Sequence, residues 1–223
     1  MDSPDQGLDR LSMLLNAHAV SGSRRQRPIP WPRGRWLSWL PQHKDVIERL
    51  PSSLDRTAVR STAESPTTSD QALAGFLAAM IWGFGKSGYG PWRVCQALTG
   101  RPDLPVVLLE AAKAASVDPV AAYTVVATHR PPRIGPAFAT KYLYFCVPES
   151  SESPLILDRL VSGWLREHAG VHINPVPWSA STYRRYLGLM KAWADELHSS
   201  PALVEELIFR DTAGGQWSDP LTL

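Results

Sequence analysis

The feature that most restricts the fold of this 223-residue chain is a five-residue link between two helical patterns. Residues 119–130 and 136–146 each have the apolar content of a helix, and the letters PPRIG separate them. A link this short permits only a tight reversal. The prolines end the first helix, and Pro136 suits the first position of the second. We therefore expect a helical hairpin at residues 119–146.

The turn of this hairpin can hold one phosphate group. Ile134 can fill the crease between the two helices, and Gly135 lets a ligand approach the backbone closely. The exposed amides at the start of the second helix, together with its dipole, favour an anion, and Arg133 adds a positive charge. A purely structural turn is the alternative that these residues leave open.

The remaining patterns predict an all-α fold. Apolar residues recur with helical spacing, most clearly in residues 70–82 and 180–198, and no segment shows convincing strand alternation. We expect a helical domain at residues 69–223. Residues 1–68 are expected to form a Pro/Arg-rich N-terminal extension, partly irregular. The Ser/Thr-rich stretch of residues 51–69 is expected to be a loop or linker between this extension and the helical domain.

The N-terminal extension carries a local excess of positive charge. The net charge of the whole chain is only +2, which does not by itself indicate a nucleic-acid partner. Five arginines and no acidic residue occur in one short run, namely Arg24, Arg25, Arg27, Arg33 and Arg35. This run fits an arm that contacts phosphates and, equally well, a solvated basic tail.

The composition argues against metal, disulfide and membrane proteins. Cys95 and Cys146 fit reduced, buried residues better than a disulfide framework, and two cysteines are too few for a four-cysteine cluster. The histidines lack metal-ligand spacing. No apolar run reaches the roughly 20 residues of a membrane span, and the N-terminus lacks the core of a secretion signal. We expect a cytoplasmic protein with no metal, no cofactor and no membrane partner.

A glycine-rich stretch, residues 83–90, connects two of the predicted helices. Its letters match the dinucleotide fingerprint G-x-G-x-x-G, but that motif must follow a strand, and here a helix precedes it. We therefore reject a dinucleotide site. A flexible connector is the plain interpretation of this stretch.

The hairpin and the aspartate that follows it resemble the helix-hairpin-helix DNA glycosylase superfamily, in particular its 8-oxoguanine glycosylase-like branch. The family hairpin reads Leu-Pro-Gly-Val/Ile-Gly, and the letters PRIG match its last four places, with Arg133 where glycine is usual. In that family a catalytic aspartate stands at the head of the next helix, behind a short apolar run. The letters SPLILD put Asp158 there. The resemblance covers approximately residues 69–210.

Asp158 has the chemistry that base excision requires. Cleavage of a base from deoxyribose passes through a positively charged, oxocarbenium-like sugar. A fixed carboxylate can stabilise that charge and can orient or deprotonate the attacking water. The alternative is that Asp158 only caps its helix, and the two roles are compatible.

Lys141 is the second catalytic candidate. The resemblance implies that bifunctional members carry a nucleophilic lysine two residues after the last hairpin glycine, where this chain has Ala137. That departure predicts hydrolysis by water rather than through a Schiff base. Lys141 lies one helical turn further on, where it can reach the pocket, contact a phosphate or be an ordinary solvated lysine.

The resemblance also gives the glycine-rich stretch a role, because in such glycosylases this loop fills the gap left by the flipped base. Tyr89 or Phe84 is the expected wedge. The other residues expected to contact DNA or the base are Lys86, Gly88 and Arg93 for DNA, and Trp82, Trp92 and Phe145 for the base pocket. Core packing is the alternative for each aromatic residue.

The resemblance thus implies a DNA glycosylase that flips and releases a modified or damaged base, and we expect it to be a monomer without lyase activity. Its setting is base-excision repair or defence against modified phage DNA, and the residues do not choose between them. A non-catalytic helix-hairpin-helix module that binds DNA is the competing class. A helical scaffold with a coincidental hairpin is the third.

Overall fold

The protein is described by a computed structural model that covers residues 4–21, 26–150 and 152–213. These residues form twelve α-helices, and their only sheet pairs β1 (Ile29–Pro30) with β2 (Ser53–Leu54) in antiparallel register. The predicted all-α class is confirmed. The helices are α1 (Pro4–Ser21), α2 (Arg33–Trp39), α3 (Lys44–Arg49), α4 (Arg56–Ala63), α5 (Ser69–Phe84), α6 (Gly90–Gly100), α7 (Leu104–Ala115), α8 (Pro119–His129), α9 (Pro136–Phe145), α10 (Arg159–Ala169), α11 (Ala180–Glu196) and α12 (Pro201–Ala213), with a short 3-10 helix at Pro41–His43.

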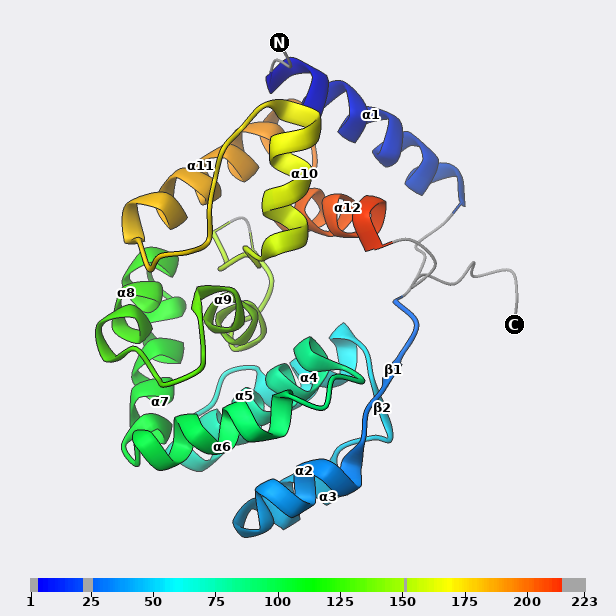
Figure 1. Cartoon of the computed structure of the whole chain (residues 1–223). Coiled ribbons are helices and arrows are strands. Elements are labelled where there is room, and N and C mark those ends of the chain that lie inside the picture. Colours follow the sequence, from blue (N-terminus) through cyan, green and yellow to red (C-terminus); the bar gives the residue numbers. More distant parts are fainter. Residues whose placement is uncertain (1–3, 22–25, 151, 214–223) are drawn as a thin grey trace.

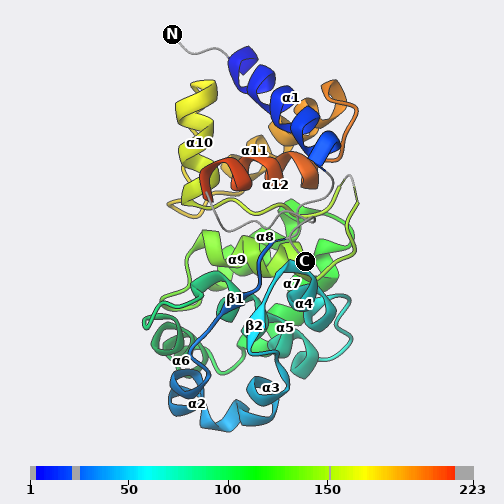
Figure 2. The same ribbon diagram turned by 90° about the vertical axis from the view of Figure 1, so that its right-hand side faces the viewer.

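The helices form two groups in space, and one of them combines helices from both ends of the chain (Figure 1). α1 packs against α10 and α12, so the N-terminal helix joins the C-terminal ones. The helices from α2 to α9 form the other group, as the turned view in Figure 2 shows. The β1–β2 ribbon runs along one side; β1 lies between α1 and α2 in the chain, and β2 lies between α3 and α4. None of the helices in the described part of the chain is long and apolar enough to cross a membrane.

Residues 51–69, expected as a loop or linker, contain β2 and α4, so that expectation is wrong. The Asp55 side chain accepts a hydrogen bond from the Ala58 amide and caps α4. Val59 and Ala63, one turn apart, are buried against α5. At Gly75 of α5 an added Cβ would lie 2.6 Å from the Ala63 Cα, so the two helices are in close contact. The apolar pattern of the sequence did not predict α4, because most of its residues are polar and only one narrow face is apolar.

α8 and α9 lie at the two positions where the sequence predicts the arms of a hairpin, and they pack against each other. α8 ends at His129, and its C-cap, Arg130, adopts the left-handed conformation, with a φ of 43°. Pro136 occupies the first turn of α9. The reversal therefore follows the local signals that the prolines and the short link supply.

Candidate functional site

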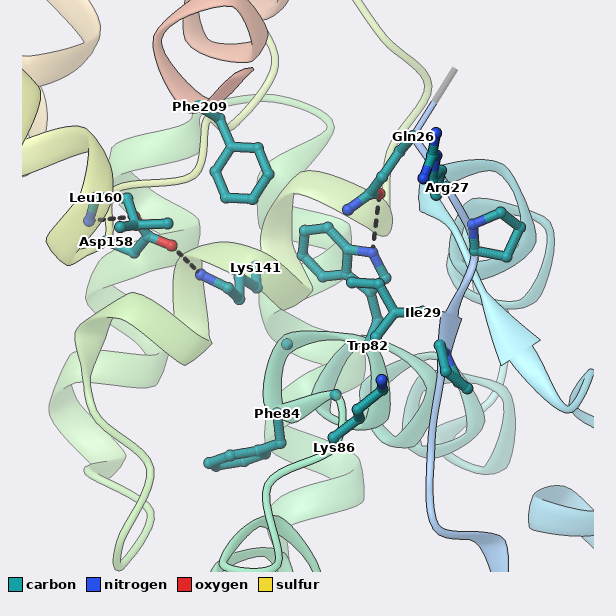
Figure 3. A pocket seen from close by; sticks show the side chains of 14 residues that line it. Gln26, Arg27, Ile29, Trp82, Phe84, Lys86, Lys141, Asp158, Leu160 and Phe209 are labelled. Atoms are coloured by element: carbon teal, nitrogen blue, oxygen red, sulfur yellow. Dashed lines mark hydrogen bonds and ion pairs between the residues drawn. The ribbon is translucent and has the colours of Figure 1, made fainter. Parts of the chain in front are cut away.

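A pocket of about 510 Å³ lies between the two groups of helices (Figure 3). Its volume is within the usual range for small-molecule sites. Five segments line it: residues 26–30 around β1, residues 82–86 at the end of α5, Lys141 of α9, Asp158 and Leu160 at the start of α10, and Phe209 of α12. Residues far apart in the sequence thus meet in one place.

Lys141 and Asp158 form a buried ion pair on the pocket wall. The distance from Lys141 Nζ to Asp158 Oδ2 is 2.5 Å, and the two residues are 7% and 9% exposed (Figure 3). The alternative of an ordinary solvated lysine is therefore wrong. Gly83 makes room for the lysine, because an added Cβ there would lie 2.9 Å from the Lys141 Cδ.

The carboxylate of Asp158 has two functions, one for each oxygen. Oδ1 accepts hydrogen bonds from the amides of Leu160 (2.9 Å) and Val161 (3.2 Å) and so caps α10. Oδ2 faces Lys141. Burial raises the pKa of Asp158, but the charge and hydrogen bond of Lys141 and the two amides outweigh it, so the pKa lies below the ordinary value of 3.8.

Residues 155–157, which belong to no helix or strand, precede Asp158, and side-chain hydroxyls form hydrogen bonds with their backbone groups. The Tyr183 hydroxyl donates to the Leu155 carbonyl, and the Tyr186 hydroxyl donates to that of Ile156. Thr140 accepts a hydrogen bond from the Leu157 amide. Both tyrosines are fully buried, so their place at the head of α11 serves the core and not a DNA-facing surface.

Trp82 and Phe209 supply aromatic surface to the pocket, and Arg56 of α4 lies close to both. The Arg56 Cζ is 5.8 Å from the centroid of the Trp82 ring and 5.5 Å from that of Phe209. Arg56 also forms a 2.9 Å ion pair with Glu205, which is completely buried. The sequence predicted Trp82 here but gave no signal for Phe209, which lies 127 residues further along the chain.

Trp92 and Phe145, predicted for the base pocket, do not line it. Phe145 is fully buried and packs edge-on against Trp82, with the ring centroids 5.2 Å apart. Trp92 lies on α6, half-buried, with the Arg133 guanidinium 5.3 Å from its ring centroid. Neighbours in sequence on a helix point in different directions, so a helical position alone does not decide which side chain faces a pocket.

The glycine-rich stretch brings one cation to the pocket and one aromatic ring to the surface. Lys86 lines the pocket, whereas Tyr89 is 71% exposed. Of the two rings predicted as the wedge, Phe84 stacks on Phe138, with 4.0 Å between the ring centroids. An added Cβ at Gly88 would clash with the guanidinium of Arg35, so this loop and α2 are in contact. Arg93 is half-buried in the first turn of α6.

The hairpin turn has the features of an anion seat. Ile134 is 4% exposed and belongs to the hydrophobic core. An added Cβ at Gly135 would meet nothing within 4 Å, so the approach to the start of α9 is open. The amides of Gly135 and Ala137 donate to no atom among the described residues. Arg133 has a φ of 64°, the left-handed conformation that explains why the resemblance expects glycine there.

Of the predicted arginine arm, Arg27 lines the pocket, while Arg33 lies 5.1 Å from the ring centroid of Trp31 and donates to the Leu50 carbonyl. Arg24 and Arg25 lie outside the described residues.

The chain was compared with protein-family models, curated proteins and solved structures. Residues 22–209 match the family model described as "Putative 8-oxoguanine DNA glycosylase OGG-like protein". No curated protein and no solved structure matches the chain. The matched range begins before β1 and ends at Phe209, so it spans every segment that lines the pocket.

Proposed function

This chain belongs to the 8-oxoguanine DNA glycosylase OGG-like family, and we propose that it excises a modified or damaged base from DNA. The observation that carries the proposal is the Lys141–Asp158 pair, with 2.5 Å between its charged atoms, on the wall of a pocket that also offers aromatic surface. A flipped base needs such surface for stacking, and the reacting sugar needs a fixed carboxylate.

In the proposed reaction, the bond between the sugar C1′ and the base nitrogen breaks, and the base leaves with the electron pair. The Asp158 carboxylate stabilises the positive charge on the sugar. A water molecule attacks C1′ and gives its proton to the departing base or to a carboxylate, leaving an abasic site. The lowered pKa of Asp158 keeps its carboxylate ionised at neutral pH, as this role requires.

A lyase is the second candidate, and the position of Lys141 favours it. Its amine nitrogen contacts the carboxylate that the reaction needs, although the residue comes one turn later than the resemblance implies. In this route Lys141 gives up a proton of its ammonium group to Asp158, and its nitrogen attacks C1′ and expels the base with the electron pair of the glycosidic bond. The C1′–O4′ bond then opens to give an imine, and the two protons that the ammonium loses end on the departing base and on O4′. Loss of a C2′ proton from the imine expels the 3′ phosphate, which breaks the strand.

The deciding experiment is a screen of duplex and single-stranded oligonucleotides that carry different base lesions and natural base modifications. We expect wild-type protein to produce alkali-labile abasic sites on one of them. Asp158→Asn, which keeps the helix cap, should bind the same oligonucleotide and produce none. Borohydride trapping then separates the two routes, because only an imine through Lys141 leaves a covalent adduct that Lys141→Gln abolishes.

If no oligonucleotide yields abasic sites, a non-catalytic DNA-binding module becomes the better account of the hairpin. We propose that the hairpin turn, with Arg133, Ile134 and Gly135, contacts one phosphate, and that Lys86, Gly88, Tyr89 and Arg93 contact DNA on the other side of the pocket. Action as a monomer in the cytoplasm, in repair or in defence against modified phage DNA, belongs to the same proposal.

A further inference from the structure

The Lys141–Asp158 pair joins the two groups of helices. Lys141 belongs to α9, which packs against α4, α5, α7 and α8, whereas Asp158 begins α10, which packs against α1 and α12. The distance of 2.5 Å between Lys141 Nζ and Asp158 Oδ2 therefore depends on how the two groups are held together at this point. A residue that fixes them here can act on the reaction without touching the substrate.

A buried hydroxyl one residue before Lys141 forms a second link between the same two places. Thr140 is 1% exposed, and its Oγ1 accepts a 3.1 Å hydrogen bond from the amide of Leu157, the residue directly before Asp158. The same oxygen lies 3.1 Å from the Ala137 carbonyl and 3.4 Å from the Leu157 carbonyl, and its one proton can be donated to either. Consecutive residues of α9 thus bond to consecutive residues of the segment that leads into α10.

The Leu157 amide needs this hydroxyl as its acceptor. Leu157 is 3% exposed and belongs to no helix or strand, so a backbone ladder does not supply an acceptor. A buried amide without an acceptor is unfavourable, because it has given up water and gained nothing in return. Valine has the shape of threonine without the hydroxyl and would fill the same space. The hydrogen bond to Leu157 is therefore what Thr140 adds to the packing.

The carboxylate of Asp158 is held from two sides. On one side its Oδ1 accepts hydrogen bonds from the amides of Leu160 and Val161, which tie it to α10. On the other side the backbone directly before it is tied to α9 through Thr140. Both attachments together direct Oδ2 toward α9. Placement of this kind has large effects on rate, because a misplacement of about 1 Å can cost on the order of 100-fold.

On the basis of the proposed function, we propose that Thr140 is a positioning residue, whose hydrogen bond to the Leu157 amide fixes α9 against the head of α10. It thereby sets the distance between Lys141 and Asp158. Thr140 is not among the residues that line the pocket, so it acts through the ion pair and does not contact the base or the sugar. A wider pair would leave the carboxylate present but wrongly placed for the charge that develops on the sugar.

Three variants separate positioning from simple support of the segment. Thr140→Val removes the hydroxyl and keeps the shape, and Thr140→Ser keeps the hydroxyl. Tyr186→Phe is the matched control, because the Tyr186 hydroxyl donates a 2.8 Å hydrogen bond to the Ile156 carbonyl of the same segment but comes from α11. Thr140→Val and Tyr186→Phe each remove one hydrogen bond from a buried backbone group, so both should lower the stability measured by urea unfolding. Only Thr140→Val should change the ion pair.

The first measurement needs no substrate. It follows the carbon-13 chemical shift of the Asp158 carboxyl, assigned by its absence in Asp158→Asn, from about pH 7 to about pH 4.5. Burial raises the pKa of Asp158, and Lys141 and the two capping amides lower it below 3.8, so the wild-type carboxylate should stay mostly ionised. In Thr140→Val the pair is wider and burial dominates, so the ionisation constant should fall by about 10-fold or more and a midpoint should appear. Thr140→Ser and Tyr186→Phe should behave like wild type. Glu205 of α12, whose charge also interacts with Asp158, is the same in all of these proteins.

The second measurement uses an oligonucleotide that the wild type cleaves at the base–sugar bond. In single turnover, Thr140→Val should release the base at least about 10-fold more slowly than wild type, with Kd unchanged within about 2-fold. Thr140→Ser and Tyr186→Phe should stay within about 3-fold of the wild-type rate. A loss of rate without a loss of affinity is expected of a residue that acts only through the ion pair.

Four results would overturn the inference. They are an Asp158 carboxyl that stays ionised in Thr140→Val, a change of the same size in Tyr186→Phe, no recovery in Thr140→Ser, and base release by Thr140→Val at the wild-type rate. Should Thr140→Val not fold, Thr140→Ala takes its place in both measurements. The carboxyl titration is independent of the proposed function. A titration shift confined to Thr140→Val without base release by the wild type would support the role of Thr140 and contradict the glycosylase, and base release with an unchanged titration would do the reverse.

Discussion

At the scale of single residues, the Lys141–Asp158 pair links stability to chemistry. Both members are buried, so removing either leaves an uncompensated charge or an unpaired polar group. We expect Lys141→Met to lower the free energy of unfolding by about 3–5 kcal/mol. The double variant with Asp158→Asn should lose much less than the sum of the two single changes. Urea unfolding of all four proteins measures the coupling, and strict additivity would show that the two residues are energetically independent.

The same pair predicts a pH dependence of stability. The pKa of Asp158 is lower in the folded protein than its ordinary value of 3.8, so the ionised carboxylate stabilises the fold. This stabilisation is fully present at pH values above the pKa of Asp158 in the unfolded chain. It is lost as the pH falls through the lower pKa of Asp158 in the folded protein. The difference in unfolding free energy between wild type and Asp158→Asn should therefore be constant above about pH 5 and shrink below about pH 4. A difference that grows on acidification would contradict the lowered pKa.

The residues of the site were predictable from the sequence to the extent that local signals mark them. Asp158 is expected from the resemblance, which places an aspartate at the head of the helix after the hairpin, and its capping role follows from ordinary helix chemistry. Gln26 and Phe209 were missed, because they reach the pocket only through packing between segments remote in the chain. A local sequence pattern does not predict which side chains from distant parts of the chain will line the same pocket.

At the scale of elements, variants of the hairpin turn can separate effects on protein stability from effects on DNA binding. Gly135 has an ordinary φ of −94° and open space where a Cβ would be. Gly135→Ala should therefore change the free energy of unfolding by no more than about 0.5 kcal/mol. Gly135→Glu should also fold, yet weaken binding to duplex DNA, since it puts a negative charge at the phosphate seat. Fluorescence anisotropy with the alanine variant as control measures the effect, and equal affinities would remove the hairpin from the interface.

A second test of the hairpin turn removes the positive charge of Arg133 rather than adding a negative charge. Its left-handed φ of 64° costs an ordinary residue on the order of 1 kcal/mol, a cost that glycine avoids. Arg133→Gly should therefore fold at least as stably as wild type while it binds DNA more weakly. The slope of log affinity against log salt should fall by about 1 if Arg133 contacts one phosphate. An unchanged slope would assign the guanidinium to its contact with Trp92 instead.

The elements themselves were the most predictable part of the fold. α5, α8, α9 and α11 lie close to the predicted ranges, because each has a capping residue or proline at its start and a regular apolar pattern. α4 was missed because its residues are mostly polar. What stabilises it is contact with α5 and α9, which a local pattern does not contain.

At the scale of the whole molecule, the N-terminal residues are part of the structure that forms the site. Leu11 of α1 is fully buried, and α1 packs against α10 and α12. Residues 26–30 form one side of the pocket. The proposed division into an extension at 1–68 and a glycosylase-like domain at 69–223 is therefore a division of the sequence, and we expect neither part to function alone.

A fragment of residues 69–223 tests this directly. It would lack Arg56, and Glu205, which is completely buried, would lose the only cation that forms an ion pair with it among the described residues. Burial already raises the pKa of Glu205 despite Arg56, so the unpaired carboxyl would be neutral or would draw water into the core. The fragment would also lose the pocket side formed by residues 26–30. We expect it to give no cooperative thermal transition, whereas the full chain with Arg56→Met should unfold cooperatively at a lower temperature. A fragment as stable as the full chain would mean that α5–α12 suffice for the core and that the N-terminal residues serve the pocket alone.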